Sequence, residues 1–588
     1  MTHSLRSFVC EISNDMAESP SPFVAVGLLL SAAIESAFGS DFAGEDAVLR
    51  PSQHADAQAN AAMALAKRVG KPPRDVAQAI IDAADLGGLV KRTEIAGPGF
   101  INLWIEEAAL GAAVVTINED AHHGVALAAD AETVVIDYSS PTITKEMHVG
   151  HLRSTIIGDA LARTFAFLGH KVIRQNHYGD WGTNYGSLLE LYIELRDGGD
   201  EPTLDDLNAF YKDADARFNS DEAFAGRARA RTVALQSGDP ETREVWNRFV
   251  TTAHAHNVEN YNRLGVLLTD DDVKPESAYN DLLADTVAEL EGNGVAVLDD
   301  GALCIFVEGY DAPLMVKKSD GGFGYGATDM AAIRYRLRDL GGTRLLYVVD
   351  SRQSQHLNQV IRAAQKADWL KPPARAEHVN FGSVMGRDGR PLKSRSGETP
   401  KLSEMLDEAV ERAALVVNEK SPDIDGDERA AIARAVGIGA VKYADLSSER
   451  VKDYTFDPER MVAFDGNTGP YLQYAHARIK SMFRRAAIEP ASVAGANVMI
   501  AEPQERALAI ALLGFDEAVN AVADGCAPHK LCTYLFDLAQ TFTSFYEACP
   551  VLKADDETRD SRLVLSGATA GVLKSGLGLL GIDAPEQL

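Results

Sequence analysis

Apolar positions recur in the middle of the chain with two spacings, and each spacing predicts a different kind of element. Short, largely apolar runs at Thr133–Tyr138, Lys171–Asn176 and Arg344–Val349 indicate buried strands. Residues 149–168 repeat apolar side chains at helical spacing, and Gly169 is placed to end that helix. The apolar face of this predicted helix carries Leu152, Ile156, Leu161 and Phe165. Strands alternating with helices predict a parallel sheet, whose ligands lie at the carboxyl ends of the strands.

A different pattern precedes this region. Residues 1–110 begin with helical periodicity and reach a Gly-Pro-Gly turn followed by Phe100–Trp104, which alternates as a strand does. This combination predicts a small mixed α+β domain. Residues 111–130 are rich in alanine and predict a helical connector to the sheet domain.

The rest of the chain divides into two further parts. The predicted sheet domain covers residues 131–401, and within it residues 190–265 are charged, helical in pattern and read as an insertion. Residues 402–588 are almost wholly helical in pattern and predict a bundle. The fold class expected is therefore multidomain α/β, with an α+β domain before the parallel sheet and a helical domain after it.

Composition and charge narrow the function classes. The chain has 588 residues, of which 46% are hydrophobic, so it can bury several cores. Its formal net charge of −29 argues against non-specific binding of nucleic acid. A local basic face is still open, since a cluster near the start of the last third is either an RNA contact or a solvated helix face. This cluster comprises Arg478, Lys480, Arg484 and Arg485.

The chain carries no pattern typical of a membrane or secreted protein. It has no apolar run long enough for a transmembrane helix and no secretory signal at its start. The five cysteines include no Cys-x-x-Cys pair. Cys526 and Cys532 flank His529, which raises a metal site as one interpretation and buried thiols in a helix as the favoured one. We therefore expect a cytoplasmic protein with no tightly bound metal.

Two histidines supply the first candidate chemistry. His148 and His151 follow the predicted strand and loop and open the predicted helix, with Gly150 between them. Glycine lets a ligand approach the backbone, and a helix N-terminus favours phosphate oxygens. Imidazoles one turn apart can stabilise charge that develops on the same phosphoryl groups. The pattern indicates a nucleotide-phosphate site at this corner of the sheet.

The surrounding residues make the pattern more specific. The run Ser140-Pro-Thr-Ile-Thr-Lys145-Glu-Met-His148-Val-Gly-His151 resembles the extended HIGH region of the arginyl-tRNA synthetases, which are class I aminoacyl-tRNA synthetases. The resemblance implies a Rossmann-like catalytic domain and ATP contacts at Pro141, Val149 and His356. The second motif of class I enzymes is degenerate here, in the run Pro391-Leu-Lys393-Ser-Arg395. In this family a lysine before the HIGH motif compensates, and Lys145 occupies that position.

The resemblance also implies an arginine pocket. An always-charged guanidinium needs anionic, planar acceptors, which the family places at positions matching Glu276 and Asp329, with Tyr325 packed on the substrate side chain. The α-amino end is expected at the remaining pocket residues, namely Asp137, Ser140, Thr142 and Gln353. Thr142 departs from the asparagine usual in the family, and a threonine hydroxyl is shorter than an amide. We expect a changed contact to the substrate amino group rather than loss of activity.

Segments at both ends resemble the tRNA-binding parts of the family. Phe100 and Asn102 are candidates for the tRNA elbow, and a strand following a turn is the plain alternative. In the predicted bundle, aromatic faces and a guanidinium suit unstacked bases and phosphates, whereas packing between helices is the alternative. These bundle candidates are Tyr471, Tyr474, His476 and Arg478.

The expected function is ATP-dependent ligation of L-arginine to tRNA(Arg) through arginyl-adenylate, with Mg²⁺ accompanying ATP and the protein acting as a monomer. Three rival interpretations are kept. A small nucleotidylyltransferase also uses paired histidines but does not need two flanking tRNA-type domains. A non-catalytic paralogue keeps the fold but is expected to lose the histidines or Lys145, all of which are present. A ligase of specialised metabolism is left open by Thr142.

Overall fold

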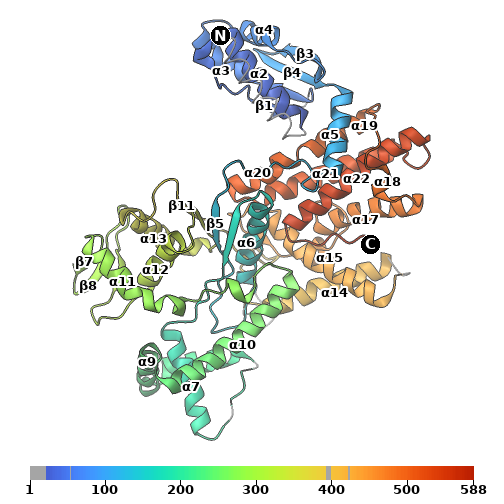
Figure 1. The fold of residues 1–588 in the computed structure, drawn as a ribbon. Helices are drawn as coiled ribbons and strands as arrows, with labels where there is room; N and C mark the ends of the chain where they lie inside the picture. Colours follow the sequence, from blue (N-terminus) through green and yellow to red (C-terminus); the bar gives the residue numbers. More distant parts are fainter. Residues whose placement is uncertain (1–20, 53, 201, 205, 393–398, 421–423) are drawn as a thin grey trace.

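The structure is a computed structural model that describes residues 21–588 apart from 53, 201, 205, 393–398 and 421–423. Figure 1 shows the chain passing from a small N-terminal unit to a central sheet, a helical insertion and a large helical bundle. The N-terminal unit stands apart at the top of the view, joined to the bundle through helix α5. The central sheet lies between the insertion and the bundle, so residues of both parts can contact it.

The N-terminal unit is an antiparallel sheet covered by helices, as the predicted α+β domain requires. Its strand order is β1-β2-β4-β3. The strands are β1 (Leu49–Pro51), β2 (Ala57–Ala59), β3 (Val90–Ala96) and β4 (Phe100–Ile105). The helices are α2 (Pro22–Phe38), the 3-10 turn η1 (Ser40–Phe42), α3 (Ala61–Val69) and α4 (Pro73–Ala83).

The connector is shorter than its alanine content predicts. Helix α5 spans Glu107–Glu119, and residues 120–132 contain no helix. The Asp120 carboxylate ends the helix, because it accepts hydrogen bonds from the backbone N–H groups of His122 (3.1 Å) and Gly124 (2.7 Å). Aspartate competes in this way with helical hydrogen bonding, which a count of alanines does not register.

The central sheet is parallel, as predicted, with strand order β11-β10-β5-β6. Its strands are β5 (Thr133–Asp137), β6 (Lys171–Gln175), β10 (Arg344–Tyr347) and β11 (Arg375–His378). The register sets Asp137 beside Gln175 and Tyr347, and Tyr347 beside His378. All four strands therefore end at one edge, where the loops that follow them converge.

Helix α6 (Val149–Phe167) crosses from β5 to β6 and packs very closely on the sheet. A Cβ atom at Gly158 would lie 2.2 Å from the Cβ of Tyr138, so only glycine permits this approach. Arg153 and Asp445 also fix the helix to the bundle through a fully buried ion pair of 3.1 Å between Nε and Oδ1. Helix α6 therefore links the sheet directly to the bundle.

The remaining elements of the sheet region form a small antiparallel sheet and the helices that flank it. The strands pair in the order β7-β8-β9, and they are β7 (Val297–Asp299), β8 (Ala302–Ile305) and β9 (Leu314–Lys317). The helices are α11 (Asn280–Gly292), α12 (Tyr325–Arg338) and α13 (Ser354–Lys366), with 3-10 turns η2 (Asp270–Asp272), η3 (Glu276–Tyr279) and η4 (Ser351–Gln353).

The insertion is helical, as predicted, and has a core of its own. Aromatic and aliphatic side chains from its helices pack together, including Phe224 and Phe249, both fully buried. The helices are α7 (Thr183–Asp197), α8 (Leu207–Ser220), α9 (Glu222–Ser237) and α10 (Pro240–Leu264). In Figure 1 this body lies below the sheet, and α10 returns from it toward the bundle.

The bundle is helical, and one short strand within it pairs back to the sheet region. Strand β13 (Tyr454–Thr455) runs parallel to β12 (Val384–Met385). A two-residue strand is too short to show any alternation, so the sequence pattern did not indicate it. The helices are α14 (Leu402–Lys420), α15 (Gly426–Leu446), α16 (Pro458–Met461), α17 (Gly469–Ala486), α18 (Pro490–Val493), α19 (Pro503–Leu513), α20 (Phe515–Gly525), α21 (His529–Ala548) and α22 (Asp556–Leu579).

Two further observations concern metal and membrane. Cys526 and Cys532 are both buried in the bundle, and burial raises the pKa of the Cys526 thiol to about 11. Over the described part of the chain, no group of three or more His, Cys, Asp or Glu side chains is arranged to hold a metal ion. Within the same residues, each helix is too short or too polar to cross a membrane.

Candidate active site

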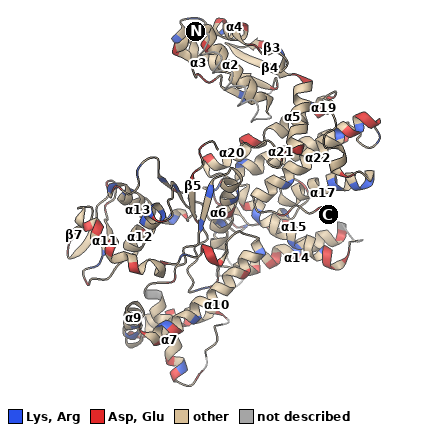
Figure 2. Ribbon diagram, viewed as in Figure 1, with Lys and Arg blue, Asp and Glu red and all other residues tan. Residues whose placement is uncertain are grey.

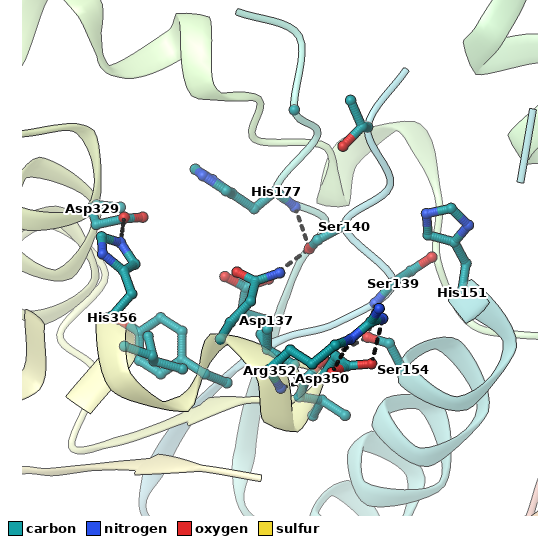
Figure 3. Close-up of a pocket in the computed structure, with 18 of the residues that line it drawn as sticks. Asp137, Ser139, Ser140, His151, Ser154, His177, Asp329, Asp350, Arg352 and His356 are labelled. Atoms are coloured by element: carbon teal, nitrogen blue, oxygen red, sulfur yellow. Dashed lines mark hydrogen bonds and ion pairs between the residues drawn. The ribbon is translucent and has the colours of Figure 1, made fainter. Parts of the chain in front are cut away.

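A cavity of about 610 Å³ opens at the edge where the parallel strands end. Figure 3 shows side chains from the β5 loop, the start of α6, the end of β6 and helices α12 and α13 meeting around it. Most of the candidates chosen from the sequence for catalysis, arginine binding and ATP binding line this cavity. They are Asp137, Ser140, Thr142, His148, Gly150, His151, Glu276, Tyr325, Asp329, Gln353 and His356.

The loop after β5 holds two residues in the left-handed backbone region, Ser139 (φ 66°) and Ser140 (φ 44°). Non-glycine residues adopt this region only where their surroundings hold them there. The backbone N–H of Ser139 donates to Ser154 Oγ (2.9 Å), and that of Ser140 donates to Asn176 Oδ1 (3.0 Å). The Ser140 hydroxyl donates to Asp137 Oδ1 at 2.6 Å. These bonds turn the chain sharply into the cavity before α6 begins.

The two histidines are locked in defined tautomers by the helix start. His148 is the N-cap of α6, and its Nδ1 accepts from the backbone N–H of Gly150 at 3.0 Å. Likewise, His151 Nδ1 accepts from the backbone N–H of His148 at 3.1 Å. Because Nδ1 is the acceptor in both rings, Nε2 carries the proton in the neutral form. The two ring centroids lie 4.1 Å apart, so the two Nε2–H donors belong to neighbouring rings.

Both imidazoles are held neutral. Burial and the neighbouring His148 lower the pKa of His151 to about 3. Burial, together with Lys145 and Arg352, lowers the pKa of His148. Gly150 is required between them, because a Cβ there would lie 2.7 Å from Cε1 of His148. The pair is therefore built to donate hydrogen bonds to an anion rather than to supply a positive charge.

The opposite side of the cavity is acidic. Burial, reinforced by repulsion from Asp329 and Asp180, raises the pKa of Glu276 to about 8. Tyr325 is 61% exposed at the same place, and burial, Glu276 and Asp329 raise its pKa. Two carboxyl groups and an aromatic ring thus face one space. Such a site fits a cation with a planar, multiply donating head.

Asp137 forms an ion pair with a buried arginine. Its Oδ2 lies 2.7 Å from Nη2 of Arg336, a fully buried residue of α12. Burial favours the neutral acid, but Arg336, His177 and the Ser140 hydroxyl outweigh it and lower the pKa of Asp137. The carboxylate therefore stays ionised while lining the cavity. Arg336 sits in an amphipathic helical run, and no signal in the sequence distinguished it from a surface arginine.

The sequence patterns did not single out two further lining residues, His177 and Arg352. His177 follows β6 and lines the cavity. Asp180 lies behind the lining, and its Oδ1 accepts a hydrogen bond from the backbone N–H of Ser277 at 2.9 Å, which fixes the turn that carries Glu276. Burial raises the pKa of Asp180 to about 6. Arg352 lines the cavity and pairs with Asp350 (Nη2 to Oδ2, 2.9 Å). The position of polar residues directly after strand ends was the available signal for them.

The three residues expected to bind ATP differ in their positions. Pro141 and Val149 are buried and are not among the residues that line the cavity. Their backbones tie the loops together instead, through Gly179 N–H to Pro141 O and Val149 N–H to Pro400 O, both 3.1 Å. His356 Nε2 lies 2.6 Å from Asp329 Oδ2, which ties the expected ATP residue to the expected arginine residue.

Lys145 is exposed and is not among the cavity residues. Its Nζ lies 3.9 Å from the centroid of the Tyr211 ring, on the insertion. Lys393 and Arg395, the candidates from the degenerate second motif, lie outside the described residues.

Comparison with known proteins shows the family of the chain. The model of the class I tRNA synthetase (R) catalytic domain matches residues 114–458, the arginyl tRNA synthetase N-terminal domain matches 27–105, and the DALR anticodon binding domain matches 472–588. The chain belongs to the arginyl-tRNA synthetase family.

Relatives and solved structures extend over nearly the whole chain. An arginine–tRNA ligase of Thermobifida fusca is 51% identical over 96% of this chain and its own full length, and one of Cellvibrio japonicus is 49% identical over 92% of this chain and 96% of its own. The crystal structure of Plasmodium falciparum arginyl-tRNA synthetase superposes with a TM-score of 0.83 at 28% identity, covering 96% of this chain and 99% of that one. The Thermus thermophilus enzyme gives 0.79 at 28% identity, with 96% and 100% covered.

The candidate tRNA contacts of the bundle differ in how far their side chains are exposed to solvent. Tyr474 is 40% exposed on α17, and Tyr471 packs edge-on against Phe536 at 5.7 Å. Arg478 covers the Tyr546 ring, with Cζ 4.2 Å from its centroid. Figure 2 shows basic residues along α17 among many acidic segments elsewhere.

Two of the tRNA candidates are wrong as exposed contacts. His476 is fully buried, and its Nδ1 lies 3.0 Å from the carbonyl oxygen of Pro585, so it has no face for a base. Asn102 is 4% exposed and accepts a hydrogen bond from Gln58 Nε2 at 2.8 Å within the N-terminal sheet. Both are polar side chains absorbed by internal hydrogen bonds, which their residue type alone does not reveal. Phe100 is partly buried.

Proposed function

We propose that the chain ligates L-arginine to tRNA(Arg) in two steps, using ATP, and that it does so as a monomer in the cytoplasm. In the first step, the arginine carboxylate attacks the α-phosphorus of ATP, forming arginyl-adenylate and releasing pyrophosphate. In the second, the terminal ribose hydroxyl of the tRNA attacks the acyl carbon and AMP leaves. Mg²⁺ enters with ATP as part of that substrate.

The single observation that carries the proposal is the polarity of the cavity. The neutral imidazoles of His148 and His151 line the same cavity as Glu276, Asp329 and Tyr325. Figure 3 shows His151 and Asp329 on opposite sides of it. An amino acid with a guanidinium side chain fits the acidic end and leaves its carboxylate pointing toward the histidines. Charge that develops on the phosphate oxygens would then meet donors that are already oriented. No side-chain nucleophile is required, so catalysis is positioning and charge stabilisation.

We propose that the domains on either side of the catalytic domain bind tRNA. We propose residues 1–110 as a domain for the tRNA elbow, 111–130 as a connector, 131–401 as the catalytic domain and 402–588 as the anticodon-binding domain. The family models at residues 27–105, 114–458 and 472–588 support a three-part division. Tyr474, Tyr471, Arg478 and Phe100 remain the proposed tRNA contacts.

Aminoacylation of total tRNA with each of the twenty amino acids, with and without ATP, tests the proposal. We expect arginine alone to be charged, and only in the presence of ATP. Charging of another amino acid would reject the assigned pocket. The absence of charging with any amino acid would favour the non-catalytic paralogue instead.

Arginine binding is expected to depend on pH through Glu276. The carboxyl is protonated in the free site below pH about 8 and must ionise to pair with the guanidinium. The dissociation constant should therefore rise about tenfold per pH unit below that value and level off above it, with a proton released on binding. Titration calorimetry in buffers of different ionisation enthalpy measures both effects. A pH-independent dissociation constant would show that Glu276 does not face the substrate charge.

Thr142→Asn is expected to tighten arginine binding. Thr142 is exposed in the cavity, and an asparagine there both donates and accepts hydrogen bonds at greater reach. One added hydrogen bond corresponds to an affinity gain of roughly twofold to tenfold. Thr142→Val is the matched control, since it removes the hydroxyl and keeps the shape. Equal dissociation constants for native and Asn proteins would mean that residue 142 does not touch the substrate.

A further inference from the structure

The helical insertion touches the loop that leads into the catalytic histidines. Lys145 is not among the residues that line the cavity, and its ammonium lies 3.9 Å from the centroid of the Tyr211 ring on α8. An ammonium this close to a ring face is attracted by the ring quadrupole. The contact fixes a side chain that is otherwise exposed and has four rotatable bonds in its stem.

The start of α8 also contacts Glu146, the residue after Lys145. The backbone N–H of Glu146 donates to Asn208 Oδ1 at 3.1 Å, and the Glu146 carboxylate pairs with Lys401 Nζ at 2.8 Å. Lys401 also lies 3.8 Å from Asp206, the N-cap of α8. The chain immediately before His148 is therefore clamped between the insertion and the start of the bundle.

Tyr211 is itself held in place. Its ring packs against the hydrophobic core of the insertion, and it is only partly exposed. The ring thus offers Lys145 a fixed face rather than a mobile one. The charge of Lys145 is felt at the active site, since it is one of the causes that lower the pKa of His148, after burial. Lys145 stands three residues before His148, so the ammonium held on Tyr211 belongs to the loop that leads into the phosphate-binding end of the cavity.

We propose that Tyr211 is a positioning residue for Lys145 in adenylate formation, fixing its ammonium at the loop that leads into His148 before ATP enters. This inference rests on the proposed function, because it needs Lys145 to act on the ATP phosphates. The inference gives the insertion a role in the reaction. Helix α8 would hold the Lys145 ammonium, which is expected to compensate for the degenerate second motif. The relevant group is the π face, not the hydroxyl, since the ammonium lies over the ring.

The test compares Tyr211→Leu with Tyr211→Phe in ATP–pyrophosphate exchange, with arginine and tRNA present. Leucine keeps the apolar packing but removes the ring, and phenylalanine keeps the ring. We expect the Leu variant to lose roughly threefold to tenfold in kcat, with an unchanged KM for arginine, and the Phe variant to stay within about twofold of the native protein. Equal losses in the two variants would overturn the proposal, and so would native activity in the Leu variant.

A double-mutant cycle with Lys145→Met separates positioning from general damage to the fold. If Tyr211 acts through Lys145, Tyr211→Leu has no further effect once Lys145 is replaced. A full additional loss in that background would overturn the inference. The underlying function fails in a different way: the native protein would not charge tRNA with arginine, or Lys145→Met would leave exchange unchanged. Unfolding temperatures of each variant exclude loss through misfolding.

Discussion

His148→Ala is expected to lower kcat for arginyl-adenylate formation by a factor of about one hundred to one thousand, the usual cost of removing one oriented donor from a developing anion. The ring presents an Nε2–H because its Nδ1 accepts from the Gly150 backbone. Alanine leaves one donor, His151, for the same charge. Pre-steady-state exchange of labelled pyrophosphate measures the step directly, and the dissociation constant of arginine should not change.

His148 also caps α6, so alanine alone confounds chemistry with helix stability. His148→Asn is the matched control, because asparagine is a good N-cap but does not reproduce the position of Nε2–H. We expect the Asn variant to unfold at the native temperature and still to be strongly impaired. An Ala variant within about threefold of native kcat would show that His148 does not act on the phosphates.

The neutral state of both imidazoles leads to an independent prediction about the pH dependence of kcat. If the histidines acted as cations, kcat at saturating substrates would fall as the pH rose through the ordinary histidine pKa of 6.5. Burial holds the pKa of His151 near 3 and lowers that of His148, so no such fall is expected. A loss of kcat on raising the pH through this range would contradict the neutral-donor assignment.

Glu276→Gln is expected to raise the KM for arginine by a factor of about one hundred or more, since it removes one partner of a buried charge pair and leaves the guanidinium less compensated. Glutamine keeps the size of the side chain and can still accept a hydrogen bond. The loss therefore reports the charge. Steady-state aminoacylation with varied arginine measures it, and kcat at saturation should change much less.

The same substitution makes a sharper test through pH. Glu276 is the group expected to release a proton when arginine binds, so the Gln variant should lose the pH dependence of the dissociation constant. Asp281→Asn, at an exposed carboxyl on the following helix, is the matched control and should behave as the native protein. A Gln variant that kept the native pH profile would assign the proton to another group, and Glu276 would then not be the guanidinium partner.

Part of the site could be predicted from patterns in the sequence. The predicted parallel sheet and the helix from residue 149 were enough to bring Asp137, His148 and His151 to one edge, because the carboxyl ends of parallel strands converge. The resemblance to a known family supplied Glu276 and Asp329, which no local pattern sets apart. These residues meet in the cavity although they come from separate elements.

The failures have a common physical cause. His476 and Asn102 were chosen for side chains able to bind RNA, yet both are buried in internal hydrogen bonds. The buried Arg336 that holds Asp137 ionised was not chosen, because an arginine in an amphipathic run is normally at the surface. Burial depends on what packs against a residue from distant parts of the chain, and local sequence does not encode that.

By itself, then, the sequence determined the order of the elements, the parallel sheet, the edge at which ligands bind and the residue types available there. These follow from the spacing of apolar positions and from motifs that are local in the chain. The tertiary structure decided the protonation of the site: which imidazole nitrogens carry protons, why Glu276 holds a proton until a cation arrives, and why Asp137 does not. It also decided that Lys145 rests on Tyr211 of the insertion. Such states depend on neighbours brought together across long stretches of chain, and on the burial that their contact creates.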